Sequence, residues 1–588
     1  MEKRLPRRLL GENGLLAAIL VVALAVRLIG IQFGKPFRYH PDEIKLVVQA
    51  GRLLEPEGRS ADALFGLGSY PPLYTYLLAG VYAAYGLAGV ALGLFGNVAA
   101  FKESYYLNTF AFHLIGRGMT ALLGAATVLV LYHVGAKAYN RRVGLLAAAF
   151  CATVFLHARN SHYLTVDVPA TFMATAVFLA AVAVYRRGGW KEIVVGGLLS
   201  GLTAATKYNA GLILVPFLVA VFLRAKDERG RATSAFIDAR LYLAVACAGL
   251  GFLLGCPLVV IDPQRFLQGF LTYGNLQAQG KVGVGGGFFA YLTGQMSPGY
   301  GVFSHNSIPS AMGPVLAALG VIGLMWLARR RTRADWLGLS FIVPYYVVIG
   351  LANYKTMRQF LPLVPFWLLA ASTLLDAAVT KVQRRRVLAS LALALFVAGA
   401  VVPELYKDVR WAVIMRGPDP RTDAKEWIEE HLSDGTAIAL EKYGPPLLDQ
   451  RDPHAQLRLR SGQYRRAYQL MDSQAQLSFG YRGEPEALVP IQEYLAARGA
   501  EYFISDSFTR DSFYLKLSVK AFPRLAAHRR AFYAWLDAEA EQVAMFAPQH
   551  NWAALLPTLM VYRLPWSQGR DQGATAHAAP GEQKLLAR

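Results

Sequence analysis

Long apolar segments separated by short polar loops fill the first two-thirds of the chain. Eleven of these segments have roughly the length that a transmembrane helix needs, although several are short and crowded. They lie near residues 14–33, 109–134, 143–157, 168–185, 192–206, 210–224, 240–261, 311–328, 336–352, 358–380 and 387–404. The pattern predicts an α-helical polytopic membrane protein with about eleven spans and about thirteen as the upper limit.

One further apolar segment, residues 71–96, does not fit this scheme. It is long enough to cross a membrane once, but it is too short for two crossings of about 20 residues each. A single crossing would place Arg141 and Arg142 outside and reverse the side of every later loop. We therefore expect the segment to lie along the outer interface, or to dip into the membrane and return.

Clusters of basic residues indicate which loops face the cytoplasm. Short cytoplasmic loops carry an excess of Lys and Arg, and the clusters alternate with loops poor in such clusters along the chain. They lie at residues 137–142, 186–191, 224–240, 329–333 and 381–386. This alternation predicts a multi-pass protein of the cell (inner or plasma) membrane, with a cytoplasmic N-terminus and an extracytoplasmic C-terminal part.

The charge of the chain follows this topology. The 588 residues are 54% hydrophobic and carry a formal net charge of +21. Residues 1–404 hold 37 Lys/Arg and 17 Asp/Glu, whereas residues 405–588 hold 23 and 22. The excess lies largely in short loops between spans, so it does not indicate a nucleic-acid partner, and the high hydrophobicity excludes intrinsic disorder.

The C-terminal part has the pattern of a small α/β domain. Residues 425–435 have a helical period that ends at a glycine, and three short apolar runs after them are typical of strands. The strand candidates are TAIALEKY, EYFISDSF and TLMVYRLP. We predict a transmembrane domain over 1–404 (with a first outer loop and its juxtamembrane helices at 34–108), an extracytoplasmic α/β domain over 405–566, and a disordered tail over 567–588.

Two carboxylates lie directly after the first span, where the chain leaves the membrane. Asp42 and Glu43 follow Arg38, His40 and Pro41 and precede an apolar helical stripe that we expect to lie on the membrane surface. Ionisable residues at a membrane rim are costly and are therefore functional candidates. The structural alternative is that Asp42 caps the helix and Glu43 only complements its dipole; the sequence leaves both open.

A third carboxylate, Asp167, stands at the outer mouth of an otherwise apolar span. It could cap the helix, pair with Arg159, or serve a site, and we favour the site because the outer side is the less positive one. Lys207 lies in a break between two spans, where it could reach the interface or hold a phosphate. Further candidate residues lie in or near these outer loops. They are Arg117, His162, Tyr354, Lys355, Arg358 and His305. A histidine in a loop like that of His305 is more often an ordinary loop residue than a ligand.

Several site types have no support in the sequence. No Cys/His spacing is typical of zinc, and the glycine-rich segments lack the Gly-Lys-Ser/Thr ending of a phosphate-binding loop. The three cysteines lie within apolar runs, so no disulfide framework is indicated. A reaction on the outer side has no nucleotide-sugar supply, so its activated substrate would be a lipid carried in the bilayer.

These residues resemble those of the GT-C superfamily of polyprenyl-phosphate-sugar-dependent glycosyltransferases, in the branch of protein O-mannosyltransferases and lipid A aminoarabinose transferases. The matching pieces occur in order along nearly the whole chain. They are HPDE (40–43), SYPPLYTYLL (69–78), IGRGMTALLG (115–124), HARNSHYLTVDVPATF (157–172), ATKYNAGL (205–212) and MRQFLPLVPFWLL (357–369), followed by RTDAKEWIEEHLSDG and LMVYRLP.

The resemblance implies a role for each candidate. Asp42 matches a general base, with Glu43 as its acidic neighbour and Asp167 as a second carboxylate that positions the acceptor. The implied substrate-binding set is His40, Arg117, Arg159, His162, Lys207, His305, Tyr354, Lys355 and Arg358, of which Arg117, Lys207 and Arg358 match residues that bind the lipid phosphate. No metal ligand is assigned and no cofactor is certain, although some relatives use a divalent metal. The run Asp-Glu-Ile-Lys-Leu departs from the Asp-Glu-x-x-Tyr of the aminoarabinose branch, which leaves the acceptor open.

We therefore expect an inverting membrane glycosyltransferase that moves a sugar from a polyprenyl-phosphate donor to an extracytoplasmic glycolipid, polysaccharide or protein. One alternative is a lipid or sugar transporter or flippase of the cell envelope, since charged residues around an outer vestibule would also serve transport. Transporters usually show repeats and broken helices near the midplane, whereas these polar residues gather on one face. A non-catalytic envelope-assembly protein is the other alternative, and it would not need Asp42, Asp167 or Arg358.

Overall fold

The computed structural model divides after Gly417 into a helical unit and an α/β unit. It describes residues 5–55, 71–279, 286–293, 307–381, 386–472, 489–514, 519, 522–549 and 556–567. The boundary lies beyond the predicted residue 404, because helix α21 continues past its apolar part. Glu404 and Asp408, in that continuation, are buried in the helical unit.

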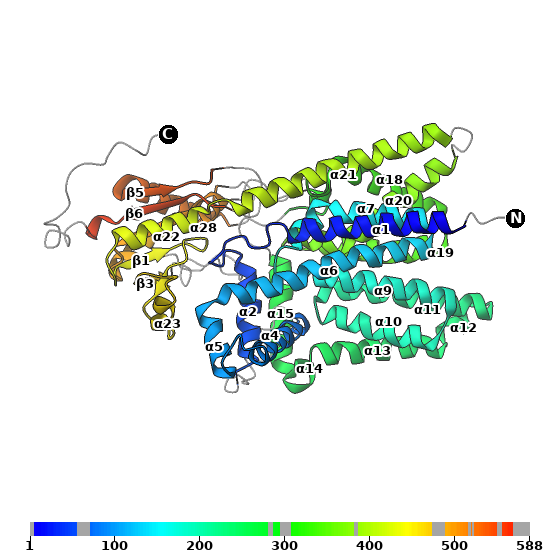
Figure 1. Cartoon of the computed structure of the whole chain (residues 1–588), viewed down its shortest axis with the longest axis horizontal. Coiled ribbons are helices and arrows are strands. Elements are labelled where there is room, and N and C mark those ends of the chain that lie inside the picture. Colours follow the sequence, from blue (N-terminus) through cyan, green and yellow to red (C-terminus); the bar gives the residue numbers. More distant parts are fainter. Residues whose placement is uncertain are drawn as a thin grey trace. The chain divides into compact units, whose positions relative to one another are not determined.

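The helical unit is a bundle whose long helices run in a common direction (Figure 1). Each of the eleven predicted spans coincides with one of its helices. The helices are α1 (Leu5–Leu28), α6 (Thr109–Ala138), α7 (Arg141–Thr153), α8 (Phe155–Asn160), α9 (Asp167–Arg187), α10 (Trp190–Ala204), η1 (Tyr208–Ile213), α11 (Leu214–Arg229), α12 (Ala232–Phe236), α13 (Ala239–Gly255), α14 (Leu258–Ile261), α16 (Ala290–Thr293), α17 (Ile308–Met312), α18 (Pro314–Arg330), α19 (Arg333–Leu351), η2 (Met357–Leu363), α20 (Val364–Lys381) and α21 (Arg386–Arg416).

Eight helical segments of the described chain are long and apolar enough to cross a membrane. Seven of them belong to predicted spans, and the eighth is α4 (Leu73–Ala91). The remaining predicted spans are α1, whose apolar part is Asn13–Leu28, and the shorter helices α7, α10 and α18.

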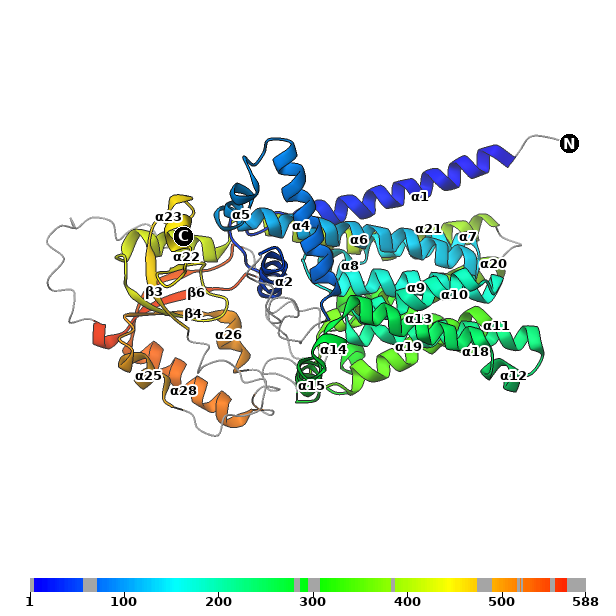
Figure 2. The same ribbon diagram turned by 90° about the horizontal axis from the view of Figure 1, so that it is seen from below.

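Three helices run across the bundle at the end away from the N-terminus (Figures 1 and 2). They are α2 (Pro41–Arg52), α4 and α15 (Pro263–Gln279), and α5 (Val98–Leu107) packs beside α4. Although α4 is long enough to span, it is one continuous helix that lies crosswise to its neighbours. Of the two arrangements expected for residues 71–96, the structure has the one in which the segment lies along the end of the bundle.

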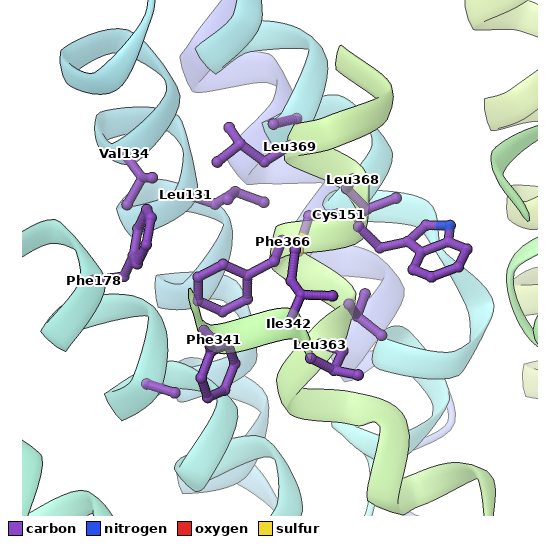
Figure 3. Packing of buried hydrophobic residues seen from close by; sticks show 14 of the residues in the cluster. Leu131, Val134, Cys151, Phe178, Phe341, Ile342, Leu363, Phe366, Leu368 and Leu369 are labelled. Atoms are coloured by element: carbon purple, nitrogen blue, oxygen red, sulfur yellow. The ribbon is translucent and has the colours of Figure 1, made fainter. Parts of the chain in front are cut away.

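The core of the bundle surrounds α20. Figure 3 shows Phe366 of α20 between Phe178 of α9 and Phe341 of α19, with ring centroids 4.9 and 4.7 Å away. Residues Val364–Thr373 of this helix are all buried. A helix that is apolar on every side is typical of the centre of a membrane bundle. Residues of η2, directly before α20, are thereby held in a fixed position.

Helices α10 and α13 approach each other through glycines. A Cβ atom on Gly201 would lie 1.9 Å from the carbonyl oxygen of Ala248, and one on Gly251 would lie 2.2 Å from that of Leu198. Small residues at such contacts let backbones pack closely where no hydrophobic force drives helices together in lipid. This contact holds the chain that leads into Lys207 at the end of α10.

We expect Gly201→Ala to destabilise the protein by about 1–3 kcal/mol, because the added methyl group must push α10 and α13 apart. The measurement is the thermal unfolding midpoint of the purified protein in detergent. Gly249→Ala is the matched control on α13, since its Cβ meets nothing within 4 Å. Equal midpoints for the two variants would contradict the close packing.

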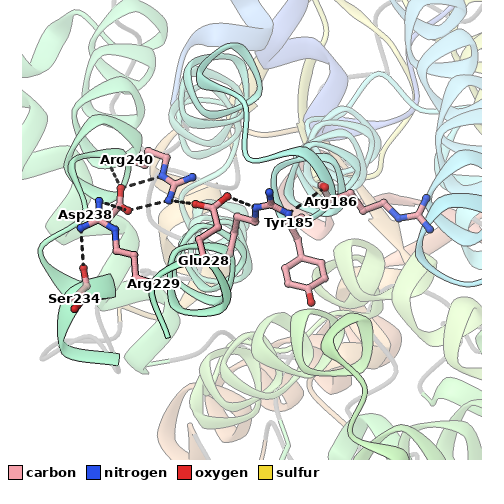
Figure 4. Close-up of polar contacts among 8 residues, drawn as sticks. Tyr185, Arg186, Glu228, Arg229, Ser234, Asp238 and Arg240 are labelled. Carbon is pink, nitrogen blue, oxygen red and sulfur yellow. Dashed lines mark hydrogen bonds and ion pairs between the residues drawn. The ribbon is translucent and has the colours of Figure 1, made fainter. Parts of the chain in front are cut away.

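Charged residues tie together the helix ends near α12 (Figure 4). Glu228 accepts from Arg224 and from Arg240 at 2.5 Å each, and Asp238 pairs with both Arg229 and Arg240 at 2.9 Å. These residues belong to the basic cluster 224–240, which the sequence assigns to the cytoplasm. Most are partly exposed, and surface ion pairs contribute little stability, so the network serves mainly to set the geometry of the turn.

The α/β unit contains a six-stranded sheet in the order β2-β3-β1-β4-β6-β5. β2, β3, β1 and β4 are parallel, whereas β6 is antiparallel to β4 and β5. The strands are β1 (Ala437–Leu440), β2 (Leu448–Asp449), β3 (Ala467–Asp472), β4 (Tyr502–Asp506), β5 (Glu541–Phe546) and β6 (Leu559–Arg563). The helices are α22 (Pro420–His431), α23 (Ala455–Arg460), α25 (Ile491–Ala497), α26 (Ser507–Ser512), α28 (Pro523–Glu539) and η4 (Pro565–Ser567).

This sheet confirms the predicted α/β class of the C-terminal part. The three strand candidates correspond to β1, β4 and β6, and the apolar faces of these strands meet α22 in one core. Its buried residues include Ile428, Ile438, Ile504 and Val561. The predicted tail after Ser567 lies outside the described residues.

Candidate active site

The two carboxylates after the first span lie at the start of α2. The helix begins at Pro41, and the N-cap residue is His40, whose side chain makes no capping hydrogen bond. Asp42 is therefore not the cap, and the structural alternative considered for it is wrong. Successive residues of an α-helix point about 100° apart, so Asp42 and Glu43 face different surroundings.

Asp42 points toward solvent and forms an ion pair with Arg358 of η2. The two side chains are 34% and 25% exposed, respectively. They are 316 residues apart in sequence, and the fold brings them together because η2 is held by the buried α20. This is a carboxylate and a guanidinium that an arriving substrate can reach.

Glu43 points inward and is fully buried against Arg117 of α6. The guanidinium donates to both carboxylate oxygens, at 2.9 and 2.7 Å, and the Leu164 backbone N–H donates to the same carboxylate at 2.9 Å. Arg117 also donates to the carbonyls of Ile31 and Phe33. Burial alone would raise the pKa of Glu43, but the Arg117 guanidinium holds it below its usual value.

This pair corrects two expectations. Neither Glu43 nor Arg117 has exposed side-chain surface, so the structure does not place them where a substrate could touch them. They join α2, α6, the turn after α1 and the loop before α9. Both residues therefore position the site.

Asp167 forms a second buried ion pair, with Lys207 at 2.6 Å. Asp167 lies in the first turn of α9 and Lys207 directly precedes η1. Arg159, which the sequence offered as a partner of Asp167, does not pair with it in the described structure. Lys207 does not reach outward to the interface either, because its side chain is only 4% exposed.

Tyr273 of α15, which the sequence analysis missed, connects the two pairs. Burial, together with nearby Asp167 and Tyr354, raises the pKa of its hydroxyl to about 12, against the opposing effect of Arg358. The hydroxyl therefore lies within electrostatic reach of both Asp167 and Arg358. A Tyr in a long amphipathic helix gives no sequence signal of such a position.

Arg159 forms no ion pair with a carboxylate among the described residues. Its Nε is buried without a hydrogen-bond partner, and its guanidinium interacts electrostatically with Tyr163. Tyr163 stacks on His40 at 4.4 Å between ring centroids, and His40 interacts with Asp42 and Arg358. Arg159 is therefore linked through Tyr163 and His40 to the Asp42–Arg358 pair, and its Nε can still donate a hydrogen bond.

The other predicted binding residues have different surroundings. His162 places its ring nitrogens 3.0 Å from the carbonyl oxygens of Ala158 and Ile29 and packs on Trp411. Lys355 is buried and donates to the Ala352 carbonyl. Both therefore have structural partners, and His305 lies outside the described residues.

A break in the bundle places Arg159. Helix α7 ends at Thr153 and α8 begins at Phe155, where one continuous span was expected. Arg27 of α1 donates to the carbonyls of Cys151 and Ala152 at 2.9 Å, and Glu404 accepts from the Phe155 N–H at 3.0 Å. A cation at a helix C-terminus and an anion at an N-terminus are the charges that helix dipoles favour.

No group of three or more His, Cys, Asp and Glu side chains within the described ranges is arranged to hold a metal ion.

One known protein family matches part of the helical unit. Residues 60–267 match the family of dolichyl-phosphate-mannose-protein mannosyltransferases, and this range contains Arg117, Arg159, Asp167 and Lys207. Over this range the chain is similar to that family. No curated protein matches the sequence.

Solved structures of an archaeal oligosaccharyltransferase have a similar fold. The apo oligosaccharyltransferase of Archaeoglobus fulgidus aligns with a TM-score of 0.53 at 12% identity, over 88% of this chain and 72% of that chain. The same archaeal enzyme, AglB, in complex with an inhibitory peptide and a dolichol-phosphate has a TM-score of 0.50 at 13% identity, over 84% and 69%. ArnT from Cupriavidus metallidurans, bound to undecaprenyl phosphate, has a TM-score of 0.48 at 14% identity, over 93% and 98%.

Proposed function

We propose that this protein moves a sugar from a polyprenyl-phosphate donor to a hydroxyl or phosphate group of an extracytoplasmic acceptor, with inversion at the anomeric carbon. The acceptor class is a glycolipid, a polysaccharide or a protein. The observation that carries the proposal is the solvent-accessible pair of Asp42 and Arg358 at the end of the bundle. It supplies both a proton acceptor and a cation for a leaving phosphate.

The donor prepares the base by competing for Arg358. A carboxylate held by a guanidinium is a weak base, because the cation stabilises its charged form. The phosphate of the donor offers Arg358 another bidentate partner, and Asp42 is then free to accept a proton from the acceptor. Catalysis thereby begins only when both substrates are present.

The transfer itself is a single displacement. The acceptor oxygen attacks the anomeric carbon while its proton passes to Asp42, and the bond between that carbon and the phosphate oxygen breaks. The electron pair stays on the polyprenyl phosphate, whose charge grows more negative. Arg358 and Arg159 stabilise that growing charge, as preorganised cations do in other transfer reactions.

Asp167, Lys207 and Tyr273 form the other wall of the proposed site. The ion pair fixes the Asp167 carboxylate, and its second oxygen can accept a hydrogen bond from the acceptor or from a sugar hydroxyl. Tyr273 keeps its proton at neutral pH because its pKa is raised, so it donates rather than bears charge. We assign these three residues to orientation of the substrates.

A transfer assay with the purified full-length protein tests the proposal. The protein is placed in nanodiscs with a panel of synthetic polyprenyl-phosphate sugars, and release of polyprenyl phosphate is measured together with sugar-bearing products. Envelope glycolipids and glycoproteins of a deletion strain, analysed by mass spectrometry, identify the acceptor. A donor that crosses the bilayer without being cleaved would support a flippase and overturn the proposal.

We expect Arg159→Gln to raise KM for the donor by about tenfold, because a charge-assisted hydrogen bond to phosphate contributes about 1.5–3 kcal/mol. Initial rates against donor concentration provide the measurement. Lys45→Gln, which removes an exposed cation from α2, is the matched control. Equal KM values for Arg159→Gln and the unaltered enzyme would remove Arg159 from the phosphate site.

A further inference from the structure

A cavity opens at the ends of α6, α18 and α20 and the start of α7. Helix α1 begins at this same end of the helical unit, away from α2 and α15 (Figure 1). The cavity has a volume of about 430 Å³. Its lining residues are Tyr139, Asn140, Val143, Arg330, Thr373, Asp376, Ala377, Thr380 and Lys381. None of them belongs to the candidate active site, and the basic clusters assign this end to the cytoplasm.

Asp376, the acidic residue of the lining, and Asp335, which pairs with the lining residue Arg330, are already matched by cations. Asp376 accepts from Asn140 at 2.7 Å and from Arg142 at 3.1 Å. Asp335, directly behind the cavity, is held by Arg330 and by the hydroxyl of Tyr139. The acids therefore cannot neutralise a further cation without losing these partners.

Lys381 is the cation of the lining that no carboxylate of the described chain neutralises. Its Nζ lies 5.3 Å from the ring of Trp326 and forms no ion pair in the part of the chain that the structure describes. A cation–π contact at an exposed site contributes only about 0.5–1 kcal/mol. An anion within reach of the flexible lysine stem would therefore displace Trp326 as its partner.

Exposed apolar side chains lie on α18, which carries the lining residue Arg330, and on α21, which follows Lys381 in the sequence. Ile322 and Met325, on the same stretch of α18 as Trp326, are exposed, and so are Val387 and Leu388 at the start of α21. Tryptophan is typical of the boundary between the membrane core and its head groups. A ligand that fills this cavity would meet cationic and polar groups on one side and the acyl chains of the bilayer on the other.

We propose that the cavity binds an anionic phospholipid of the cytoplasmic leaflet, with its head-group phosphate between Lys381 and Arg330. Basic cavities between transmembrane helices on the cytoplasmic side recognise such head groups. The exposed apolar side chains of α18 and α21 favour a lipid over a soluble phosphate compound. The bound lipid joins α6, α7, α18 and α20, all of which contribute side chains to the buried core of the bundle.

The test uses the full-length protein in zwitterionic phosphatidylcholine, with phosphatidylglycerol added in steps. Native mass spectrometry counts the retained lipid, and the thermal unfolding midpoint gives its apparent Kd. We expect Lys381→Gln to weaken phosphatidylglycerol binding at least tenfold and Lys381→Arg to retain it. Arg329→Gln removes the same charge one residue outside the lining and should leave the affinity unchanged.

Two results would overturn the proposal. Equal losses in Lys381→Gln and Arg329→Gln would show that only the general charge of this end attracts lipid. An identical shift of the unfolding midpoint with inorganic phosphate alone would assign the cavity to a soluble anion. Sugar transfer, measured on the same samples, is expected to be unchanged in Lys381→Gln, so the outcome is independent of the function proposed for the other end.

Discussion

Asp42→Asn is expected to lower the rate of sugar transfer by roughly 10²–10⁴-fold, the usual contribution of a positioned general base. Asparagine can still contact Arg358, but it cannot accept the proton of the attacking group. The effect should appear in kcat, with KM for the donor little changed, because the donor phosphate is held by cations. The measurement is single-turnover release of polyprenyl phosphate in nanodiscs.

Glu103→Gln is the matched control for this variant, since it neutralises another exposed carboxylate of the first outer loop, on α5. Its transfer rate should equal that of the unaltered enzyme. Transfer by Asp42→Asn at more than a tenth of the normal rate, in protein that unfolds at the normal temperature, would show that the base is another group.

Glu43→Gln is expected to destabilise the protein by about 3–5 kcal/mol, because it leaves the charge of Arg117 buried without a counter-ion. The Leu164 amide and the turn after α1 would lose their fixed positions with it. We expect a large fall in the thermal unfolding midpoint and in the yield of monodisperse protein.

The neighbouring carboxylate provides the control. Asp42 is partly exposed, so Asp42→Asn should shift the free energy of unfolding by no more than about 1 kcal/mol. The double variant Glu43→Gln, Arg117→Met should regain part of the stability lost in Glu43→Gln, because it removes the unpaired charge. A Glu43→Gln protein of normal stability and no activity would assign catalysis to Glu43.

These two residues also show what the sequence could and could not predict. Their position directly after the first span was enough to identify them as candidate site residues, because charge at a membrane rim is costly whatever the rest of the fold is. Their separation into an accessible and a buried group depends on Arg117 and Arg358, which lie 74 and 316 residues away, respectively. No local pattern contains that information.

The fold was likewise predictable from the sequence in some parts and not in others. Apolar length placed the eleven predicted spans on helices of the bundle, because the bilayer acts on each residue separately, and seven of these spans are long and apolar enough to cross a membrane. The break at Val154 was missed, since an apolar run reads as one helix unless remote residues stabilise two ends. Arg27 and Glu404 do so here, and each looked like an ordinary residue at the edge of its own span.

In the α/β unit, β1, β4 and β6 were found because each is a compact apolar run next to turn residues. β3 and β5 were missed because their short sequences, AYQLMD and EQVAMF, mix polar and apolar residues without a clear period. Pairing with β1 and β6 makes them strands, and such pairing is a property of the folded sheet.

The position of Arg27 also sets an order of events during synthesis. On its own in lipid, an arginine in an apolar helix costs up to about 3 kcal/mol. The carbonyl of Cys151 that shares its guanidinium is made 124 residues later. Helix α1 is therefore not settled in the membrane until α7 arrives beside it, so biogenesis of this protein must hold α1 in a partly hydrated place, at the translocon or the membrane surface, while the described helices α2, α4, α5 and α6 are made.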